Sequence, residues 1–546
     1  MAKANINSKK LNNIRDIEEY GAVGDGSTDN RAFFRTAIEE DGIVHIPPGE
    51  FVIEVPDGAN ALPVPNITMF TGEGKGVSII KFKYSQTSGV ARNCFSITGR
   101  LALFNLSVVI ENAGTDITPM FRGSGLSNLR IENCELNGGM TDDGSSATAD
   151  SYGIYVPATG TQEDITVVGN DIHSFNWFFV KDNDDTSTQT RMKYLRNRFY
   201  NHYRTPILLN SPAGELNDCE IAFNTFEGGR GIALGLANCF HIGVSGSQVN
   251  IHDNVMKGAV EYAMHFEEYI YDSAAVNNRI LIHSTGTGGI RFLVNNNGDG
   301  STWVWPTKVL ISQNSIEYLG TAKASETRGI SVINDGDSTI TDAEEILVSL
   351  NRVTGVERAY SSHGNLDKGV LFLNNYAQNC AEAGRTTESQ HAITGLTAKD
   401  CDVGVVASSG GTFINPTFIN VTTPMTASGR LGVLVNPRFV FSPTTVGAAS
   451  TTDFTVFPLT AQGRVSGRIV GYQICDNTTD SVYANWSAEW DGSTATLTAV
   501  QDRSPGGTNV TFVNSGGNLL ARLTSTSARS DVKVTVHVHG DMMLGA

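Results

Sequence analysis

The chain has 546 residues, 40% of them apolar and 17% charged, with 57 glycines, 16 prolines and a formal net charge of −17. Its length excludes one compact core and its composition excludes disorder, so we expect several domains or a turn-rich repeat architecture. The acidic balance excludes a surface that follows nucleic-acid phosphates, so nucleic acid is not an expected partner.

The N-terminus and the cysteines indicate the cellular compartment in which the protein folds. The segment MAKANINSKKLNN has no apolar core behind its positive charges, and no run of about 18 apolar residues follows anywhere, so neither a signal peptide nor membrane insertion is expected. The seven cysteines are an odd number without the spacing of metal ligands. This predicts buried free thiols in a protein folded in a reducing cytoplasm.

Residues 30–40 are expected to form a helix that covers the open end of a solenoid. Thr28 or Asp29 can cap its start, and Gly42 can close it. Four side chains share one apolar face: Phe33, Phe34, Ala37 and Ile38.

From about residue 165 to 377, an asparagine recurs at intervals of 24 to 37 residues, each with a small or apolar residue two positions later. Short apolar strands such as Ile165–Val168 precede these asparagines. Stacked coils explain the pattern, because asparagine side chains can hydrogen-bond from coil to coil at a turn that tolerates left-handed backbone. The eight are Asn170, Asn197, Asn224, Asn254, Asn278, Asn314, Asn351 and Asn375.

A second series of strands opens on a small residue followed by an apolar one, as in Gly153-Ile154. Aligning the later coils on this series places five side chains inside: Ile232, Met264, Ile290, Ile330 and Val370. Because side chains alternate along a strand, the following residues face outward. They are Ala233, His265, Arg291, Ser331 and Leu371, and two positions further Gly235, Glu267, Leu293, Ile333 and Leu373.

Near residue 410 the repeat shortens to Asn415-Pro416 and Asn436-Pro437, 21 residues apart. Beyond about 450 the strands alternate, most clearly in Asp531–His539, as in half-buried antiparallel strands. This change predicts a separate C-terminal β-sandwich.

Three segments at the N-terminal end resemble the opening of the pectate-lyase-like β-helix superfamily, which includes phage tailspikes and capsule depolymerases. They are residues 20–29 (YGAVGDGSTD), Ala37-Ile38 and residues 42–51 (GIVHIPPGEF). The resemblance implies a homotrimer with a trimerising C-terminal domain, located on the virion tail after assembly in the host cytoplasm. It also implies endo-acting cleavage of a capsule or O-antigen polysaccharide.

The resemblance has two gaps. The Asn-Thr-Asp and Gly-Asp-Asp motifs of polygalacturonases are not found at a recurring strand position, so no catalytic motif carries over residue by residue. Only about 15 residues precede the matching segments. Either the protein joins the virion through other phage tail proteins, or the chain is a shortened one.

The expected fold is therefore all-β: a right-handed parallel β-helix with an N-terminal capping helix and a C-terminal β-sandwich, forming a homotrimer. The expected divisions are a short extension at 1–15, the β-helix entrance with its lid helix at 16–60, the parallel β-helix at 61–442, and a C-terminal β-sandwich at 443–546 that serves trimerisation or glycan binding.

The sequence suggests chemistry on the outward face near residues 260–340. His265 and Glu267 leave the same strand, and Arg291 is expected on the next coil, a combination suited to acid–base work on an acidic sugar. A trimer-contact ion pair is the alternative. Glycoside hydrolysis needs a second carboxylate, which Asp335 or Asp337 can supply two coils away, with Glu268 and Asp299 as weaker candidates for the site.

Aromatic residues extend this expected surface. Trp303 and Trp305 lie in a loop after Arg291, where their indoles can stack on sugar rings or pack against a subunit. Trp177 and Tyr155 can add binding area, although core packing is an alternative. No metal site is expected, because residues 334–341 lack the ligands of a calcium loop and no other ligands accompany His537 and His539.

Three functions remain open at this point. The first is endo-glycosidic hydrolysis by Glu267 with Asp335 or Asp337, without a cofactor. The second is β-elimination from a polysaccharide that contains uronic acid, with Arg291 neutralising the carboxylate and His265 or Tyr262 as the base. The third is a fibre that binds glycan without cutting it.

Overall fold

The computed structural model describes residues 14–40, 42–55, 60–84, 93–111, 118–123, 125–140, 151–156, 161–181, 188–210, 216–229, 239–258, 260–267, 270–294, 307–334, 344–363, 370–387, 391–408, 411–427, 432–446, 450–458, 465–468, 470–475, 481–490, 495–503, 508–515, 518–525, 529–537 and 539–544. The chain forms two compact units, Met1–Thr287 with Thr302–Val304, and Gly288–Ser301 with Trp305–Ala546.

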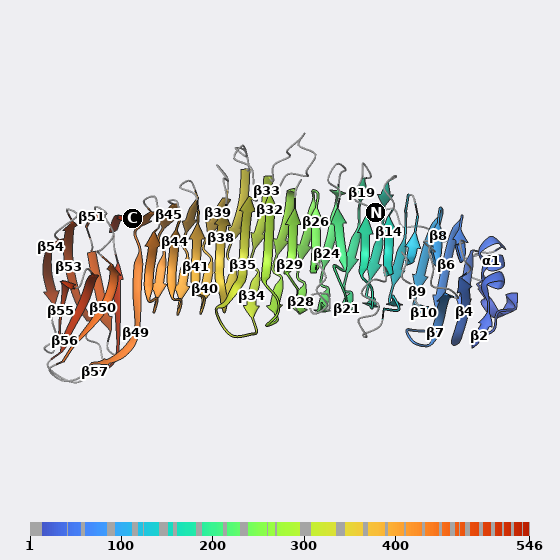
Figure 1. Cartoon of the computed structure of the whole chain (residues 1–546), viewed down its shortest axis with the longest axis horizontal. Helices are drawn as coiled ribbons and strands as arrows, with labels where there is room; N and C mark the ends of the chain where they lie inside the picture. Colours follow the sequence, from blue (N-terminus) through green and yellow to red (C-terminus); the bar gives the residue numbers. More distant parts are fainter. Residues whose placement is uncertain are drawn as a thin grey trace. The chain divides into compact units, whose positions relative to one another are not determined.

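Most coils of the first unit contain three short strands, and each strand pairs in parallel with its equivalents in neighbouring coils (Figure 1). The first strands are β1 (Arg15–Asp16), β3 (Ile43–Ile46), β6 (Ile67–Gly72), β9 (Arg100–Phe104), β12 (Arg130–Glu132), β16 (Thr166–Val168), β20 (Lys193–Leu195), β24 (Cys219–Ala222), β27 (Val249–His252) and β30 (Tyr271–Val276). The second strands are β2 (Asp25–Asp29), β4 (Gly49–Val55), β7 (Ser78–Tyr84), β10 (Ser107–Glu111), β13 (Glu135–Asn137), β17 (Asp171–His173), β21 (Arg198–His202), β25 (Thr225–Gly228), β28 (Val255–Gly258) and β31 (Arg279–Ile282). The third strands are β5 (Leu62–Val64), β8 (Phe95–Ile97), β11 (Thr118–Arg122), β14 (Ser151–Val156), β18 (Trp177–Lys181), β22 (Ile207–Asn210), β26 (Phe240–Ser245) and β29 (Tyr262–Glu267).

The second unit continues the three-strand pattern. Its third strands are β32 (Gly288–Val294), β35 (Ala324–Asn334), β38 (Val356–His363), β41 (Glu382–Thr386), β44 (Val403–Ala407) and β47 (Thr423–Ala427). The first strands are β33 (Thr307–Ser312), β36 (Glu344–Ser349), β39 (Val370–Leu373), β42 (Ala392–Thr394), β45 (Gly411–Ile414) and β48 (Gly432–Val435). The second strands are β34 (Ser315–Tyr318), β37 (Arg352–Thr354), β40 (Tyr376–Gln378), β43 (Thr397–Lys399), β46 (Thr417–Ile419) and β49 (Arg438–Val446).

These parallel series confirm the predicted right-handed parallel β-helix. The interior is apolar, and glycine occurs within some third strands where a side chain would collide with it. A Cβ at Gly329, for example, would lie 2.5 Å from Cγ1 of Val353. We call the outward face of the third strands the wall. A minor sheet in the first unit joins β15 (Gln162–Glu163), β19 (Gln189–Thr190) and β23 (Leu216–Asn217).

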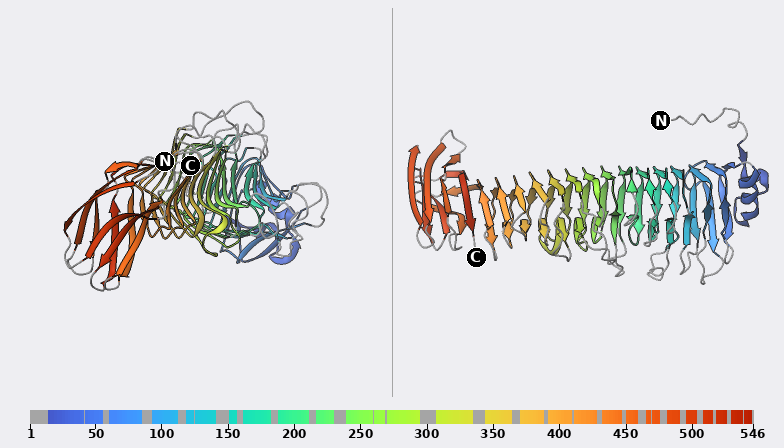
Figure 2. Two further views of the ribbon diagram at one scale, coloured as in Figure 1. Left: turned by 60° about the vertical axis from the view of Figure 1, so that its left-hand side comes forward. Right: turned by 90° about the horizontal axis from the view of Figure 1, so that it is seen from above.

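The predicted lid helix is confirmed as α1 (Arg31–Glu40), which follows the short 3₁₀ helix η2 (Ile17–Tyr20) and packs against β3, β4 and β5 (Figure 2). Asp29 caps it, since its Oδ1 accepts the backbone N–H of Arg31 at 3.0 Å, whereas Thr28 donates its hydroxyl to Asp25. Gly42 ends the helix with a φ of 67°. On the predicted apolar face Phe34, Ala37 and Ile38 are buried and Phe33 is half-buried.

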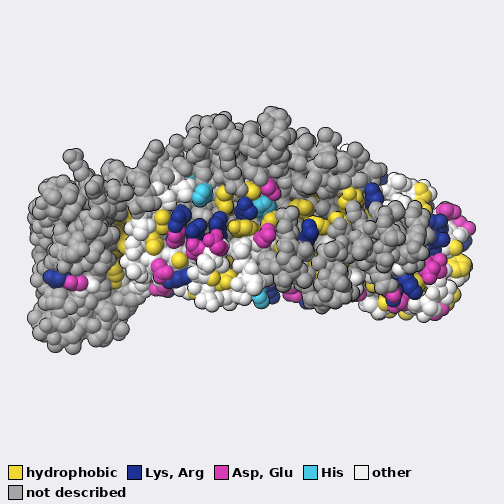
Figure 3. Space-filling view, in the orientation of Figure 1, with side chains coloured by type: hydrophobic (Ala, Val, Ile, Leu, Met, Phe, Trp, Pro, Cys, Tyr) yellow, Lys and Arg dark blue, Asp and Glu magenta, His cyan; other side chains and the backbone are white. Residues whose placement is uncertain are grey.

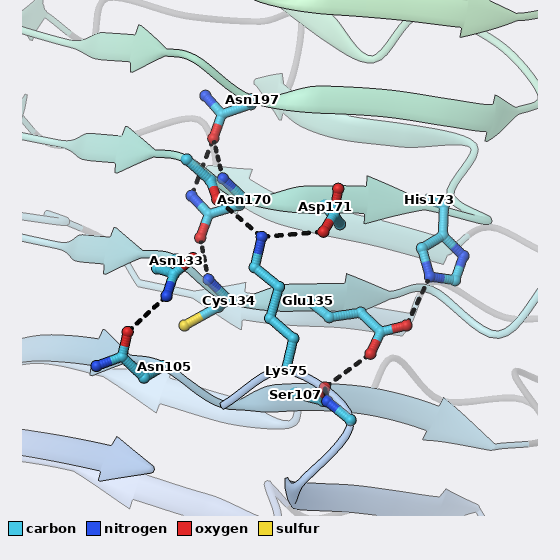
Figure 4. Close-up of polar contacts among 12 residues, drawn as sticks. Lys75, Asn105, Ser107, Asn133, Cys134, Glu135, Asn170, Asp171, His173 and Asn197 are labelled. Atoms are coloured by element: carbon cyan, nitrogen blue, oxygen red, sulfur yellow. Dashed lines mark hydrogen bonds and ion pairs between the residues drawn. The ribbon is translucent and has the colours of Figure 1, made fainter. Parts of the chain in front are cut away.

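The asparagine ladder is confirmed in the first unit, and Figure 4 shows its first two members, Asn170 and Asn197. Nδ2 of Asn170 donates to Oδ1 of Asn197 at 2.9 Å, and Asn197 donates to Asn224 at 3.1 Å. In the same way Asn224 donates to Asn254, and Asn254 donates to Asn278, each at 3.0 Å. All five side chains are buried, so the ladder satisfies polar groups that water cannot reach.

The second unit repeats the ladder from Asn314 through Asn351 to Asn375, at 3.0 and 3.1 Å. Left-handed backbone belongs to the residue before each ladder asparagine, not to the asparagine itself. These residues are Gly169, Arg196, Phe223, Asp253, Asn277, Gln313, Leu350 and Asn374.

The shortened repeats follow the same turn with a shift of one residue. Asn415 and Asn436 have φ values of 50° and 47°, so they take the left-handed position, and Pro416 and Pro437 take the ladder position. A ladder asparagine donates its backbone N–H to the side chain of the next coil, as Asn351 does to Asn375. Proline has no N–H, so Pro416 and Pro437 need no side-chain acceptor at these two positions.

Beyond the coils the chain changes to antiparallel pairing. β49 pairs with β57 (Arg529–His537) from Arg438 onward, and β48 pairs with β58 (His539–Leu544). Two antiparallel groups contain the remaining strands. One holds β51 (Val465–Arg468), β52 (Val470–Cys475), β53 (Ser481–Trp490) and β54 (Ala495–Arg503), and the other β50 (Ser450–Pro458), β55 (Thr508–Ser515) and β56 (Asn518–Ser525). The sandwich and the trimer stay predictions.

The described cysteine side chains are buried free thiols, as predicted: Cys94, Cys134, Cys219, Cys239, Cys380 and Cys401. Burial raises the pKa of the first four to about 12, so these thiols stay protonated at neutral pH. Within the described ranges, no helix has the length and apolar character needed to cross a membrane.

Two buried histidines make the first unit sensitive to acid. Nε2 of His202 lies 3.1 Å from Nδ1 of His241, and burial lowers the pKa of His202 from 6.5 to about 4. As the pH falls below about 6.5, His202 binds a proton in the unfolded chain before it does so in the folded one. The free energy of unfolding therefore decreases between about pH 6.5 and pH 4. We expect His202 to account for about 3 kcal/mol of this loss.

Denaturant unfolding at a series of pH values checks this expectation. The variant His202→Gln has no titrating ring at this position, so its stability should decline less than that of the unaltered protein over the same range. Parallel stability curves for the two proteins would contradict the assignment.

Candidate functional site

The wall of the first unit contains a histidine–carboxylate pair on β29. Nε2 of His265 lies 3.1 Å from Oε2 of Glu267, where the sequence placed both residues. His265 is nevertheless buried, whereas the side chain of Glu267 is 37% exposed. Glu267 is thus the member of the pair that an incoming molecule can reach.

Phe240 of β26 fixes the orientation of the histidine. Its ring stacks on the imidazole of His265 with centroids 4.4 Å apart and an interplanar angle of 18°. Gly243 lies opposite His265 in the register and has no side chain to intervene. Nδ1 of His265 is buried and has no hydrogen-bond partner among the described atoms. The tautomer with its proton on Nε2 therefore suits the site, because that proton is donated to Glu267.

Five large, flat side chains pack on the wall over β11, β14, β18 and the turn before β22, and we call them the aromatic–guanidinium stack: Arg122, Tyr152, Tyr155, Trp177 and Arg204. The rings of Tyr152 and Trp177 stack with centroids 5.3 Å apart at 7°. Cζ of Arg204 lies 4.6 Å from the Trp177 ring, and Cζ of Arg122 lies 5.4 Å from that of Tyr155. Tyr155 and Trp177 were predicted from the sequence, whereas the other three were not.

Arg291 lies on β32, in the second unit, and is half-buried. In the strand register it lies opposite Ser331 of β35. The hydroxyl of Ser331 is 3.0 Å from the hydroxyl of Ser361 on the next coil. Because Arg291 and the pair of β29 belong to different units, their grouping in one site stays a prediction.

The second unit carries a charged group on its wall that the sequence reasoning missed. Figure 3 shows side chains of both signs gathering over β35, β38 and β41. They are Glu326, Arg328, Glu357, Arg358, Glu382 and Arg385. Arg358 lies 3.2 Å from Glu357 and 3.6 Å from Glu382, so it links two coils. A glutamate followed within three residues by an arginine near the start of successive third strands is the signal that could have revealed the group.

The second strands carry another polar cluster, shown in Figure 4. Glu135 accepts from the hydroxyl of Ser107 at 2.7 Å and lies 3.3 Å from Nε2 of His173, whose pKa is lowered by burial. Lys75, from the turn before β7, reaches Asp171 at 2.9 Å. These contacts connect β10, β13 and β17 to an earlier turn, which indicates a stabilising role.

Several predicted site residues lie outside the described residues: Asp335, Asp337, Glu268, Asp299, Trp303 and Trp305. The side chains of His537 and His539 are not described either. Within the part of the chain that is described, no three His, Cys, Asp or Glu side chains are grouped so that they could hold a metal ion.

One member of the predicted interior column is wrong. Val370 lies on β39, a first strand, opposite Ile346, and the third-strand residue opposite Ile330 is the buried Tyr360. The pattern of a small residue before an apolar one also occurs where first strands begin. Ile232 lies outside the described residues, and Ile242 of β26 occupies the position opposite Met264.

Comparison with known proteins relates the chain to two groups. In a segment of 123 residues it is 32% identical to the pre-neck appendage proteins of Bacillus phages phi29 and PZA. The segment is 22% of this chain, and the match spans only 14% of the length of these relatives.

The fold is similar to those of several solved structures. A tailspike protein mutant of E. coli bacteriophage HK620, in complex with a pentasaccharide, has 10% identity and a TM-score of 0.45 over 99% of this chain and 95% of its own. The A-module of the mannuronan C-5 epimerase AlgE6 of Azotobacter vinelandii has 14% identity and a TM-score of 0.40 over 70% and 99%. Residues 14–305, more than half of the chain, match the family described as rhamnogalacturonase A/epimerase, pectate lyase-like. The chain therefore belongs to this pectate-lyase-like family.

Proposed function

We propose that this protein is a phage tailspike that binds a bacterial capsule or O-antigen polysaccharide and cuts it by endo-glycosidic hydrolysis. The observation that carries the proposal is the half-exposed carboxylate of Glu267, held by the buried His265 on the wall. The similarity to phage appendage proteins supports a place on the virion tail. The proposal includes a homotrimer, assembled in the host cytoplasm and joined to other tail proteins.

Glu267 is suited to proton transfer because His265 holds its carboxylate while the side chain is 37% exposed. A glycosidic oxygen or a water molecule could approach this exposed part of the group. Hydrolysis needs a second carboxylate, about 5 Å away for retention of configuration or about 6.5 to 9.5 Å away for inversion. Asp335 or Asp337 is proposed for that role, with Arg291, Glu268, Asp299, Trp303 and Trp305 contributing to sugar binding.

β-Elimination is the second candidate, because one strand carries two possible bases. Tyr262 and His265 both belong to β29. In this reaction the base removes the proton next to a uronic-acid carboxylate, and the leaving sugar departs as a double bond forms. A fibre that binds without cutting is the third candidate.

Sizing the polysaccharide released from capsulated cells tests these functions together. Hydrolysis should shorten the chains without new ultraviolet absorbance, whereas elimination should shorten them and create a conjugated double bond that absorbs. An unchanged length distribution would contradict both enzymatic functions and leave the adhesive fibre.

A further inference from the structure

The two arginines of the aromatic–guanidinium stack have no acidic partner among the described residues. Among the described residues, neither Arg122 nor Arg204 has a carboxylate oxygen within 4.0 Å, although the chain carries 56 acidic and 39 basic residues. By contrast Arg130, Arg191 and Arg198 each form an ion pair. Within the described part of the chain, the stack therefore places two positive charges without a paired carboxylate on the wall.

The orientation of each guanidinium over its aromatic ring determines which groups it can bind. A guanidinium that lies over an aromatic ring is fixed in orientation, and its N–H groups point outward in its own plane. In that plane it can donate two parallel hydrogen bonds to one carboxylate or phosphate. Nε of Arg204 and Nε1 of Trp177 are buried donors without a hydrogen-bond partner among the described atoms.

The stack lies on the same face as Glu267 at a definite separation. Tyr155 of β14 and His265 of β29 occupy the same outward column, four strands apart through β18, β22 and β26. At the usual spacing between neighbouring strands, four steps amount to about 19 Å. Between them the column holds Val180, the half-buried Leu208 and the buried Gly243, none of which has a charge to repel a polymer.

We propose that the stack is a distal subsite for an anionic group, carboxylate or phosphate, on a glycan chain that runs along the coils toward Glu267. The inference rests on the proposed function for the direction of the chain, although the anion site itself stands on the stack alone. The bound glycan must then span both places, so fragments too short to reach from one to the other should bind through one place only.

Binding measurements by calorimetry test the subsite in the Glu267→Gln background, which prevents cutting during the experiment. The probes are oligogalacturonates of increasing length, the same fragments after reduction of their carboxyl groups, phosphomannan fragments and neutral dextran. Arg204→Gln should weaken oligogalacturonate binding about ten-fold or more, the range expected for a lost charge-assisted hydrogen bond. Arg204→Lys keeps the charge but lacks the planar guanidinium, so its affinity for oligogalacturonate should lie between those of Arg204→Gln and the parent. Tight binding of phosphomannan but not of oligogalacturonate would identify phosphate as the anion.

The matched control is Arg130→Gln, because Arg130 also lies over an aromatic ring, Phe104, but is paired with Glu132 away from the wall. Its binding should be unchanged, and melting curves should show that every variant is folded. Arg122→Gln provides a second test if Arg204→Gln does not fold. Equal affinities of both stack variants and the parent, or equal binding of dextran and the anionic probes, would overturn the subsite. Full depolymerase activity of Glu267→Gln would instead overturn the catalytic proposal and leave the stack unaffected.

Discussion

Replacing Glu267 with glutamine is expected to lower the rate of polysaccharide cleavage by at least about 100-fold, the lower end of what a positioned proton-transfer group contributes. Glutamine has nearly the same shape and can still accept the hydrogen bond from His265, which lies 3.1 Å from the carboxylate. Its amide is neither an acid nor a base near neutral pH, so binding should persist while cleavage stops. The release of reducing ends from capsule or O-antigen polysaccharide measures the rate.

The control for this variant is Glu317→Gln. Glu317 is exposed on β34, a second strand of the other unit, so its substitution changes the net charge equally without touching the wall of β29. Its rate and melting temperature should match those of the unaltered protein. If Glu267→Gln keeps the full rate with an unchanged melting temperature, Glu267 is not the acid–base group, whatever the role of the fold.

The sequence predicted His265 and Glu267 together because alternation along one strand is a local property. The two residues are separated by a single position, so any register of the coils leaves them on the same face. The contact of Phe240 with His265 depends instead on how β26 aligns with β29 across a connection of its own length. Because the coils have unequal lengths, the sequence alone does not show which residues of neighbouring coils lie opposite each other. For the same reason Val370 was assigned to the wrong strand.

Charge pairs across coils were missed for the same reason. Arg358 and Glu382 are 24 positions apart in the chain but lie opposite each other on β38 and β41. The ladder asparagines were found because all of them repeat the same residue at the same turn, which is visible without knowing the register. The sequence did not show that the left-handed conformation belongs to the residue before them, because residues as different as Arg196, Phe223 and Leu350 adopt it.

The ladder leads to the largest expected effect on stability, in the variant Asn224→Leu. Oδ1 of Asn224 accepts the backbone N–H of Asn197 at 2.9 Å, and its Nδ2 donates to the carbonyl oxygen of Tyr194 at 2.8 Å. Leucine leaves both buried backbone groups without these partners, at about 1–3 kcal/mol for each group. We therefore expect the free energy of unfolding to fall by about 2–6 kcal/mol, measured by denaturant unfolding.

Asn250→Leu is the matched control, because Asn250 is exposed on β27 in the next coil. Its free energy of unfolding should change by no more than about 0.5 kcal/mol. The chain itself places Leu396 at a ladder position, beyond the last asparagine, so leucine fits this turn sterically. A large loss at Asn224 would then come from the unsatisfied polar groups. A loss no greater than that of Asn250→Leu would mean that the turn satisfies its backbone without the side chain, and the ladder would be a consequence of the coil rather than a cause of it.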